Sequence, residues 1–139
     1  MVLFRLGYFS VIPDKHAADG SAFTGALTLF SQRMAQIAAR KGLTGGILCE
    51  PPFIATVMEG TRRNVNEAFL RHIVDPQLGS CTLIGAEVIA QRAFTHWSAA
   101  PFEADPRRGA IRADMVTLEE LTDFVQLAAN DIMDVDIAS

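Results

Sequence analysis

Apolar residues recur at alternate positions along the first segment of the chain, from Val2 to Ser10. One set of alternate positions is apolar from residue 2 to residue 8 and comprises Val2, Phe4, Leu6 and Tyr8. Side chains of a β-strand point in turn to its two faces, so this period of two predicts a strand. The opposite set also contains Leu3 and Phe9, and we therefore expect both faces of the strand to be covered.

A helical period follows the loop signals Ile12-Pro13-Asp14 and Asp19-Gly20. Ser21 is a suitable N-terminal cap for this helix. Its predicted apolar stripe comprises Phe23, Leu27, Phe30, Met34 and Ile37. We expect the helix to run to about Lys41 and to end at Gly42, because glycine readily adopts the left-handed conformation found after helices.

Two short apolar runs, Leu43 to Cys49 and Phe53 to Met58, flank Glu50-Pro51-Pro52 and predict a hairpin. A second helix is predicted from Asn64, which has the capping-box spacing to Glu67. Its predicted buried face comprises Val65, Phe69 and Ile73, and Pro76 and Gly79 end it.

The last two predicted strands are Thr82 to Ala90 and Ala93 to Trp97. The order βαββαββ predicts an α+β, ferredoxin-like mixed sheet with two helices on one face. After a surface connection from Pro101 to Asp114, Thr117 and Glu120 have capping-box spacing for a third helix. The predicted stripe of that helix comprises Leu118, Leu121, Val125, Ala128 and Ile132. We expect it to pack on the other face of the sheet, over Leu3 and Phe9.

Composition narrows the class of protein. Of the 139 residues half are apolar, which suits a single core, and twelve Lys and Arg against sixteen Asp and Glu give a net charge of −4. This charge disfavours nucleic acid as a partner. With no membrane-length apolar run and no signal peptide, we expect a soluble, cytoplasmic protein. Cys49 and Cys81 lack metal-site spacing, so no metal is expected.

Three motifs between residues 2 and 100 keep a consistent order and spacing. Tyr8-Phe9-Ser10 comes first, and Ala93-Phe94-Thr95-His96-Trp97 comes last. Between them, Gly42-Leu43-Thr44-Gly45-Gly46-Ile47-Leu48, Phe53 and Met58-Glu59-Gly60 outline a glycine-bounded strand, a hairpin and a strand ending in Glu-Gly. Together they resemble the BLUF family of flavin-binding blue-light sensors. We therefore expect a BLUF-like domain over residues 1–100 and a connection with a packed helix over residues 101–139.

The resemblance implies FAD as cofactor, with its ring between the two helices on the sheet face that carries Tyr8, Thr56, Trp97 and Ala99. The cofactor-binding residues that it implies are Tyr8, Arg40, Thr56 and Asp75. The asparagine and glutamine of the family fall on Ala38 and Thr56, and its Asp-x-Arg-His group is Asp75-Pro76-Gln77-Leu78 here.

These departures affect the light switch that the resemblance implies. In the family a glutamine amide bridges the tyrosine and the flavin, whereas threonine offers one hydroxyl close to the backbone. We therefore expect the usual photochemistry to be lost. If flavin is lost as well, Phe30, Met34 and Phe69 are the expected fillers of the groove, because an empty cavity of that size is costly.

Three classes of function remain after these observations. The first is a BLUF-type sensory domain that binds FAD or FMN and signals to another protein, and the second is a chromophore-free interaction module. An acylphosphatase-like enzyme is a weaker alternative, because Val11-Ile12-Pro13-Asp14 does not form a phosphate loop. We expect no enzyme activity and interpret His72 and His96 as satisfied or exposed histidines. The downstream partner is not identified, and a homodimer stays open.

Overall fold

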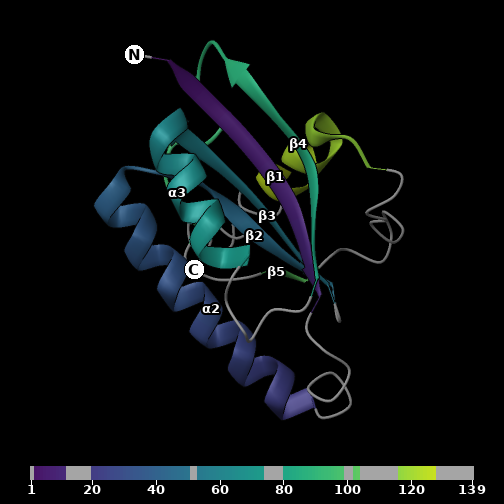
Figure 1. The fold of residues 1–139 in the computed structure, drawn as a ribbon. Coiled ribbons are helices and arrows are strands. Elements are labelled where there is room, and N and C mark those ends of the chain that lie inside the picture. The colour runs from purple at the N-terminus through teal and green to yellow at the C-terminus, as the bar shows by residue number, and fades with distance from the viewer. Residues whose placement is uncertain are drawn as a thin grey trace, which may run out of the picture.

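The structure, a computed structural model, describes residues 2–11, 20–50, 53–73, 80–98, 102–103 and 116–127. Its elements are β1 (Leu3–Val11), α2 (Gly20–Lys41), β2 (Thr44–Glu50), β3 (Phe53–Thr61), α3 (Arg62–Ile73), β4 (Cys81–Ile89) and β5 (Phe102–Glu103). A further helix at residues 118–127 is called the 118–127 helix. The strands form one sheet in the order β4-β1-β3-β2-β5, with β5 parallel to β2 and the other pairs antiparallel (Figure 1).

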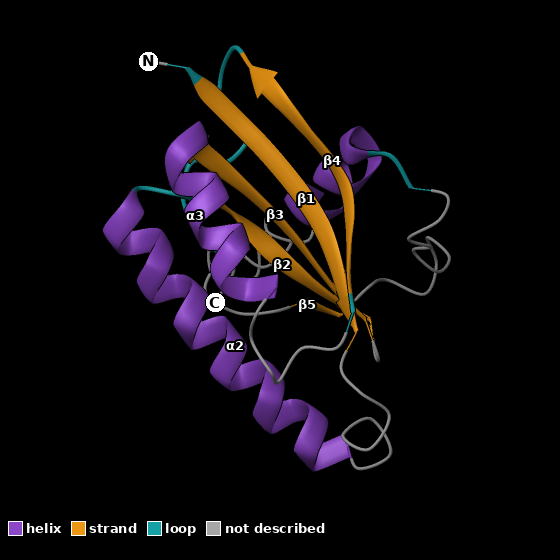
Figure 2. Ribbon diagram, in the orientation of Figure 1, coloured by secondary structure: helices purple, strands orange, loops and turns teal. Residues whose placement is uncertain are grey.

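The helices lie in two layers, one on each face of the sheet. Helices α2 and α3 cover one face, and the 118–127 helix lies behind the sheet against the other (Figure 2). The predicted α+β, ferredoxin-like arrangement is therefore confirmed. The core on the α2/α3 face includes Phe4, Leu6, Tyr8, Phe30, Met34, Ile37, Ala38, Ile47, Ile54, Met58, Val65 and Ala68. The core on the opposite face comprises Phe9, Leu48, Ala55, Val57, Phe94, Leu121 and Val125.

The 118–127 helix approaches the sheet closely at two glycines. A Cβ placed on Gly7 would lie 2.7 Å from the Leu118 Cδ1, and one on Gly85 would lie 3.1 Å from the Leu118 Cβ. The Thr117 hydroxyl accepts from the Glu120 backbone N–H, which confirms the predicted cap. Phe9 is covered as expected. The expectation for Leu3 is wrong, because this half-buried residue at the start of β1 does not pack on that core.

The N-terminus of α3 differs from the predicted capping box. The helix starts at Arg62, and the Thr61 hydroxyl accepts from the Asn64 backbone N–H at 3.2 Å, so Thr61 is the cap. The Asn64 side chain instead donates to the Lys41 carbonyl at 3.0 Å and ties α3 to the end of α2. Glu67 adds an ion pair with Lys41 at 2.5 Å. These two side chains therefore stabilise the contact between the helices.

The predicted strand from Ala93 to Trp97 is wrong in extent. This segment makes only an isolated bridge, between Gly45 and Trp97, and the adjoining bonds are Gly45 N–H to the His96 carbonyl and Ser98 N–H to the Gly45 carbonyl. A short strand, β5, forms instead at Phe102–Glu103, within the predicted surface connection. The rest of that connection lies outside the described residues.

A buried carboxylate explains why this segment is not a strand. The side chain of Glu59 is fully buried. It accepts from the Ala93 and Phe94 backbone N–H groups at 2.9 and 3.1 Å, so these donors are not available to a neighbouring strand. Glu59 also accepts from Arg5 at 3.0 and 2.8 Å and from Thr44 at 3.2 Å. The carboxylate therefore joins β1, β2 and the segment before Trp97.

None of the described helices combines the length and the apolar character that crossing a membrane requires.

We expect Glu59→Gln to lower the free energy of unfolding by about 3–5 kcal/mol, the usual cost of breaking a buried ion pair. The amide nitrogen would face donors from Arg5 and the backbone. Urea unfolding followed by the fluorescence of Trp97, the single tryptophan, measures the loss. Glu87→Gln is the matched control, because Glu87 pairs with the same Arg5 but is 49% exposed, and its loss should stay below about 1 kcal/mol. Equal losses would contradict the central role of Glu59.

We expect Gly45→Ala to cost about 4 kcal/mol or more. Gly45 has a φ of 139°, and a Cβ there would lie 2.0 Å from the Val57 carbonyl oxygen. Gly42→Ala is the control, since Gly42 has a φ of 65° but open space around it, and its cost should be about 1–2 kcal/mol. The same urea measurement compares the two variants, and similar midpoints would show that the close backbone approach is unimportant.

Candidate functional site

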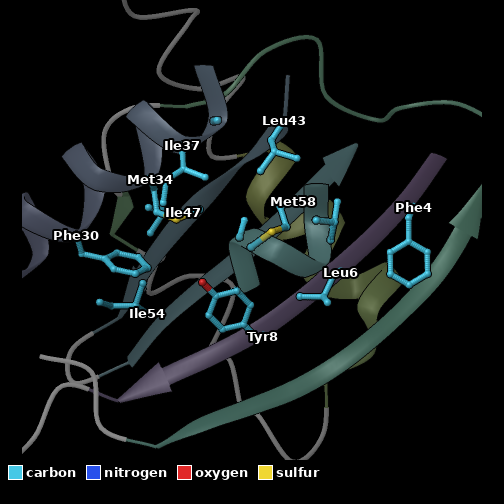
Figure 3. Packing of buried hydrophobic residues seen from close by; sticks show 13 residues of the cluster. Phe4, Leu6, Tyr8, Phe30, Met34, Ile37, Leu43, Ile47, Ile54 and Met58 are labelled. Carbon is cyan, nitrogen blue, oxygen red and sulfur yellow. The ribbon is translucent and has the colours of Figure 1, made fainter. Parts of the chain in front are cut away.

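Tyr8 lies at the centre of the sheet, under helices α2 and α3. Its side chain is fully buried and lies on the same face of β1 as that of Leu6, two residues earlier (Figure 3). Its direct cross-strand partner on β3 is Thr56, which is also fully buried. The register thus brings two of the predicted site residues side by side on one face.

The phenol of Tyr8 forms a hydrogen bond with Nδ1 of His72, a buried residue near the C-terminal end of α3. Aromatic rings hold both partners in place. Phe69 packs on Tyr8 and Phe30 packs on His72, each with ring centroids 5.0 Å apart in a tilted arrangement. The pair therefore joins the sheet to α3 inside an aromatic cluster.

Burial raises the pKa of the Tyr8 phenol above its ordinary range, because the phenolate would lose its hydration. The nearby Thr56 side chain opposes this shift in part, and Cys81 adds to it. Tyr8 is therefore protonated at neutral pH and available as a donor. Its O–H donates to Nδ1 of His72, which assigns the other ring proton of a neutral imidazole to Nε2.

Two polar side-chain atoms near this pair are buried without a hydrogen-bond partner in the described part of the chain, the Thr56 Oγ1 and the Trp97 Nε1. Thr56 is close enough to affect the Tyr8 pKa, but its hydroxyl lacks hydrogen-bond geometry. Trp97 packs against the same core as Tyr8. Buried polar groups are normally paired, so this face has hydrogen-bonding capacity that a ligand can satisfy.

A cleft of about 310 Å³ opens beside His72, between α2 and α3. Its lining comprises Phe30, Arg33, Gln36, Ile37, Arg40, Arg71 and His72. Arginines make the described part of this lining positive, and none of the described lining residues is acidic. His72 therefore contacts Tyr8 and also borders a cleft suited to an anion. Among the described residues no group of His, Cys, Asp and Glu is arranged to hold a metal ion.

The predicted site residues fall in different parts of this arrangement. Tyr8 and Thr56 are adjacent on the sheet, and Arg40 borders the cleft. Asp75 lies outside the described residues, as do Gln77, Leu78 and Ala99. Ala38 is buried in the core and offers no polar group. Phe30 and Met34, two of the expected fillers, are buried in the same core, and Phe69 packs on Tyr8.

Sequence reasoning did not connect His72 with Tyr8. His72 and His96 are each interpreted from the sequence as a satisfied or exposed histidine, and in the structure His96 is exposed whereas His72 is buried and bonded to the central tyrosine. The predicted face of α3 included Ile73, which is exposed. The spacing Val65, Ala68 and His72 gives the observed face, and a helical wheel centred on Val65 would have placed His72 inward.

A flavin fits part of this chemistry. An aromatic floor suits a flat ring, and guanidinium groups suit a phosphate. The volume of the cleft is at the lower end of the range for small-molecule pockets. If a flavin nucleotide binds in this cleft, Arg40 and Arg71 would hold its phosphate, and Phe30 and His72 would lie against its ring.

Solved structures with similar folds include BlsA, BlrB and BlrP1. Photo-activated BlsA matches with a TM-score of 0.74 and 14% identity, covering 91% of this chain and 94% of that one. Dark-state BlrB, described as a BLUF protein, gives 0.68 and 23%, covering 93% and 97%. Klebsiella pneumoniae BlrP1 with FMN and cyclic diGMP gives 0.56 and 25%, covering 88% of this chain and 30% of that one. No curated protein sequence matches the chain.

The model of one protein family matches residues 3–100, which is most of the chain. Its description is sensors of blue light using FAD. The matched range includes β1 with Tyr8, both helices over the sheet and the segment that ends at Trp97. The chain therefore belongs to the BLUF family of flavin-binding blue-light sensory domains.

Proposed function

We propose that this BLUF domain binds a flavin nucleotide in the cleft between α2 and α3 and has lost the usual glutamine-based light switch. The observation that carries the proposal is the lining of the cleft, where arginines surround an aromatic floor that leads to Tyr8. When bound, the flavin would supply absorption of blue light and a one-electron oxidant.

Arginines at the mouth favour the nucleotide over the flavin ring alone. Arg40 near the end of α2 and Arg71 near the end of α3 border the same cleft. Guanidinium groups form charge-assisted hydrogen bonds with phosphate oxygens. The FMN present with BlrP1 is a ligand of this chemical class. We propose that the phosphate binds Arg40 and Arg71 and that the ring lies toward Phe30 and His72.

Loss of the two amides should lower the affinity for the flavin ring. Ala38 presents a methyl group and Thr56 a short hydroxyl where the family resemblance implies amides. Each lost hydrogen bond costs roughly 1 kcal/mol, so the affinity should be about tenfold or more below that of a complete site. Protein purified without added flavin should therefore be colourless or contain less than one flavin per chain.

In this chain the tyrosine of the light switch has a different hydrogen-bond partner. The family switch, as the resemblance implies it, exchanges hydrogen bonds between tyrosine, glutamine and flavin. In this chain the Tyr8 hydroxyl donates to His72, and the residue opposite Tyr8 is Thr56. Because threonine has no amide to rotate, we propose that the usual exchange is absent.

The second candidate is the chromophore-free interaction module, and one observation favours it. Phe30 and Met34 are almost completely buried in the core that contains Tyr8, as expected of side chains that refill a groove. In either case the output passes to another protein, and we propose a signalling role without catalysis. BlrP1 is much longer than the part that this chain covers, and one neighbour is a light-regulated adenylyl cyclase.

Titration of the protein with FAD, FMN and riboflavin, followed by flavin fluorescence, tests the proposal. We expect FMN and FAD to bind more tightly than riboflavin, which has no phosphate. Arg40→Ala with Arg71→Ala should weaken FMN binding by about tenfold or more, the value of one charged hydrogen bond, and leave riboflavin nearly unchanged. Arg63→Ala is the control, because Arg63 is exposed and pairs with Glu67 outside the cleft. Absence of binding by all three ligands would favour the chromophore-free module.

Restoration of the amides by Ala38→Asn and Thr56→Gln should raise flavin affinity by about tenfold, at roughly 1 kcal/mol for each hydrogen bond. Blue light should then produce a reversible red shift of the flavin spectrum that Tyr8→Phe abolishes. Ala39→Asn is the control, because Ala39 is exposed on the same helix. If affinity and spectrum are unchanged, the groove has been refilled by side chains such as Phe30 and Met34.

A further inference from the structure

Tyr8 is the single tyrosine of the chain, and it is paired with a base inside the core. The sequence contains one tyrosine and three histidines. One of these histidines, His72, comes from α3, 64 residues further along the chain, and its Nδ1 accepts from the Tyr8 phenol. A buried phenol needs a hydrogen-bond acceptor but not a basic one, so the choice of an imidazole calls for a functional reason.

We propose that His72 is the proton acceptor of Tyr8 when Tyr8 gives up an electron. The inference rests on the proposed function, since the electron acceptor is a photo-excited flavin in the adjoining cleft. One electron leaves the phenol for that oxidant. The phenolic O–H bond breaks, its proton forms a bond to Nδ1 of His72, and a neutral tyrosyl radical and an imidazolium result. Return of the electron to Tyr8 sends the proton back to the phenol.

The geometry for this transfer already exists. Phe69 packs on the ring of Tyr8 and Phe30 on the ring of His72, so donor and acceptor are held in hydrogen-bond contact without rearrangement. Two other polar side chains act on the Tyr8 phenol, the Thr56 hydroxyl and the Cys81 thiol, and neither a hydroxyl nor a thiol is a base at neutral pH. A one-electron-oxidised phenol is a strong acid, and His72 is the base at hand.

The surroundings of His72 make the transfer reversible. Among the described residues, the charged groups that line the cleft are Arg33 and Arg40 from α2 and Arg71 from α3, and the titratable group facing His72 from β1 is Tyr8. Arginines keep their charge throughout the ordinary pH range, so an imidazolium formed beside them is disfavoured. Tyr8 remains a protonated phenol in its resting state because burial disfavours the phenolate. The proton therefore returns to Tyr8 when the electron does.

This role differs from that of a structural partner. A glutamine side chain at position 72 can accept a hydrogen bond from Tyr8, but its amide is not a base. A neutral acceptor would keep Tyr8 in place without taking its proton. The variant His72→Gln therefore separates positioning of Tyr8 from acceptance of its proton.

The experiment oxidises Tyr8 in flavin-free protein with a soluble one-electron photo-oxidant and follows the tyrosyl radical by transient absorption. The signal belongs to Tyr8 because the chain has one tyrosine. In the parent protein we expect a formation rate that does not depend on buffer concentration and that falls in D2O. His72→Gln should slow the rate by about a hundredfold, the lower end of the contribution of a general base. His96→Gln is the control, because His96 is exposed and contacts Thr95, and it should leave the rate unchanged.

A second variant, His72→Ala, distinguishes loss of the base from a structural change at position 72. His72→Ala opens space beside the cleft, and added imidazole should restore the rate toward the parent value. An unchanged rate and isotope effect in His72→Gln, or no oxidation of Tyr8 in the parent protein, would overturn the proposal. So would a slow His72→Ala that imidazole does not rescue.

The two proposals can fail separately. The radical measurement uses no flavin, so failure of every flavin to bind would remove the proposed function while the proton transfer to His72 is still observed. Conversely, tight binding of FMN with an unchanged rate in His72→Gln would keep the flavin site and remove His72 as the proton acceptor.

Discussion

The arrangement of the sheet depends on the carboxylate of Glu59. It is buried on β3 and receives hydrogen bonds from Arg5 on β1, from Thr44 on β2 and from the backbone at Ala93 and Phe94. Burial of a charge is costly unless partners replace its hydration, and these donors do so. The same interaction holds the segment that leads to Trp97, whose ring packs on the core around Tyr8. The Glu59 carboxylate on one face of the sheet thus helps to position Trp97, which packs on the core of the other face.

The helices on the two faces of the sheet make different contacts. The 118–127 helix packs on a dry core through Leu121 and Val125. Helices α2 and α3 are joined at one end by the Asn64 and Lys41 contact and leave a positive cleft along their length. A sheet backed on one side by a packed helix therefore carries the positive cleft on its other side.

The chain keeps the fold of its family, and we propose that the chemistry of its site differs from the family's. Apolar or short side chains stand where the family resemblance implies amides, and His72 has become the partner of Tyr8. These differences concern single side chains on the face of the sheet that carries Tyr8, whereas the strand order and the Glu59 network concern the framework that supports that face. A fold hosts new chemistry in this way when substitutions are confined to the site.

The sequence by itself determined the elements from β1 to β4 and the 118–127 helix, because alternation in β1, the stripe of α2 and the capping pair of Thr117 and Glu120 are local patterns. Those patterns were sufficient to place the 118–127 helix opposite α2 and α3. They did not determine that residues 93–97 are bonded to Glu59 instead of to a strand, or that Asn64 caps α2 instead of α3. The pairing of Tyr8 with His72 joins residues 64 positions apart and depends on the rotation of α3 over the sheet. Only tertiary packing decides that rotation, since several helical faces satisfy the same apolar pattern and the one that buries the most compatible surface is selected.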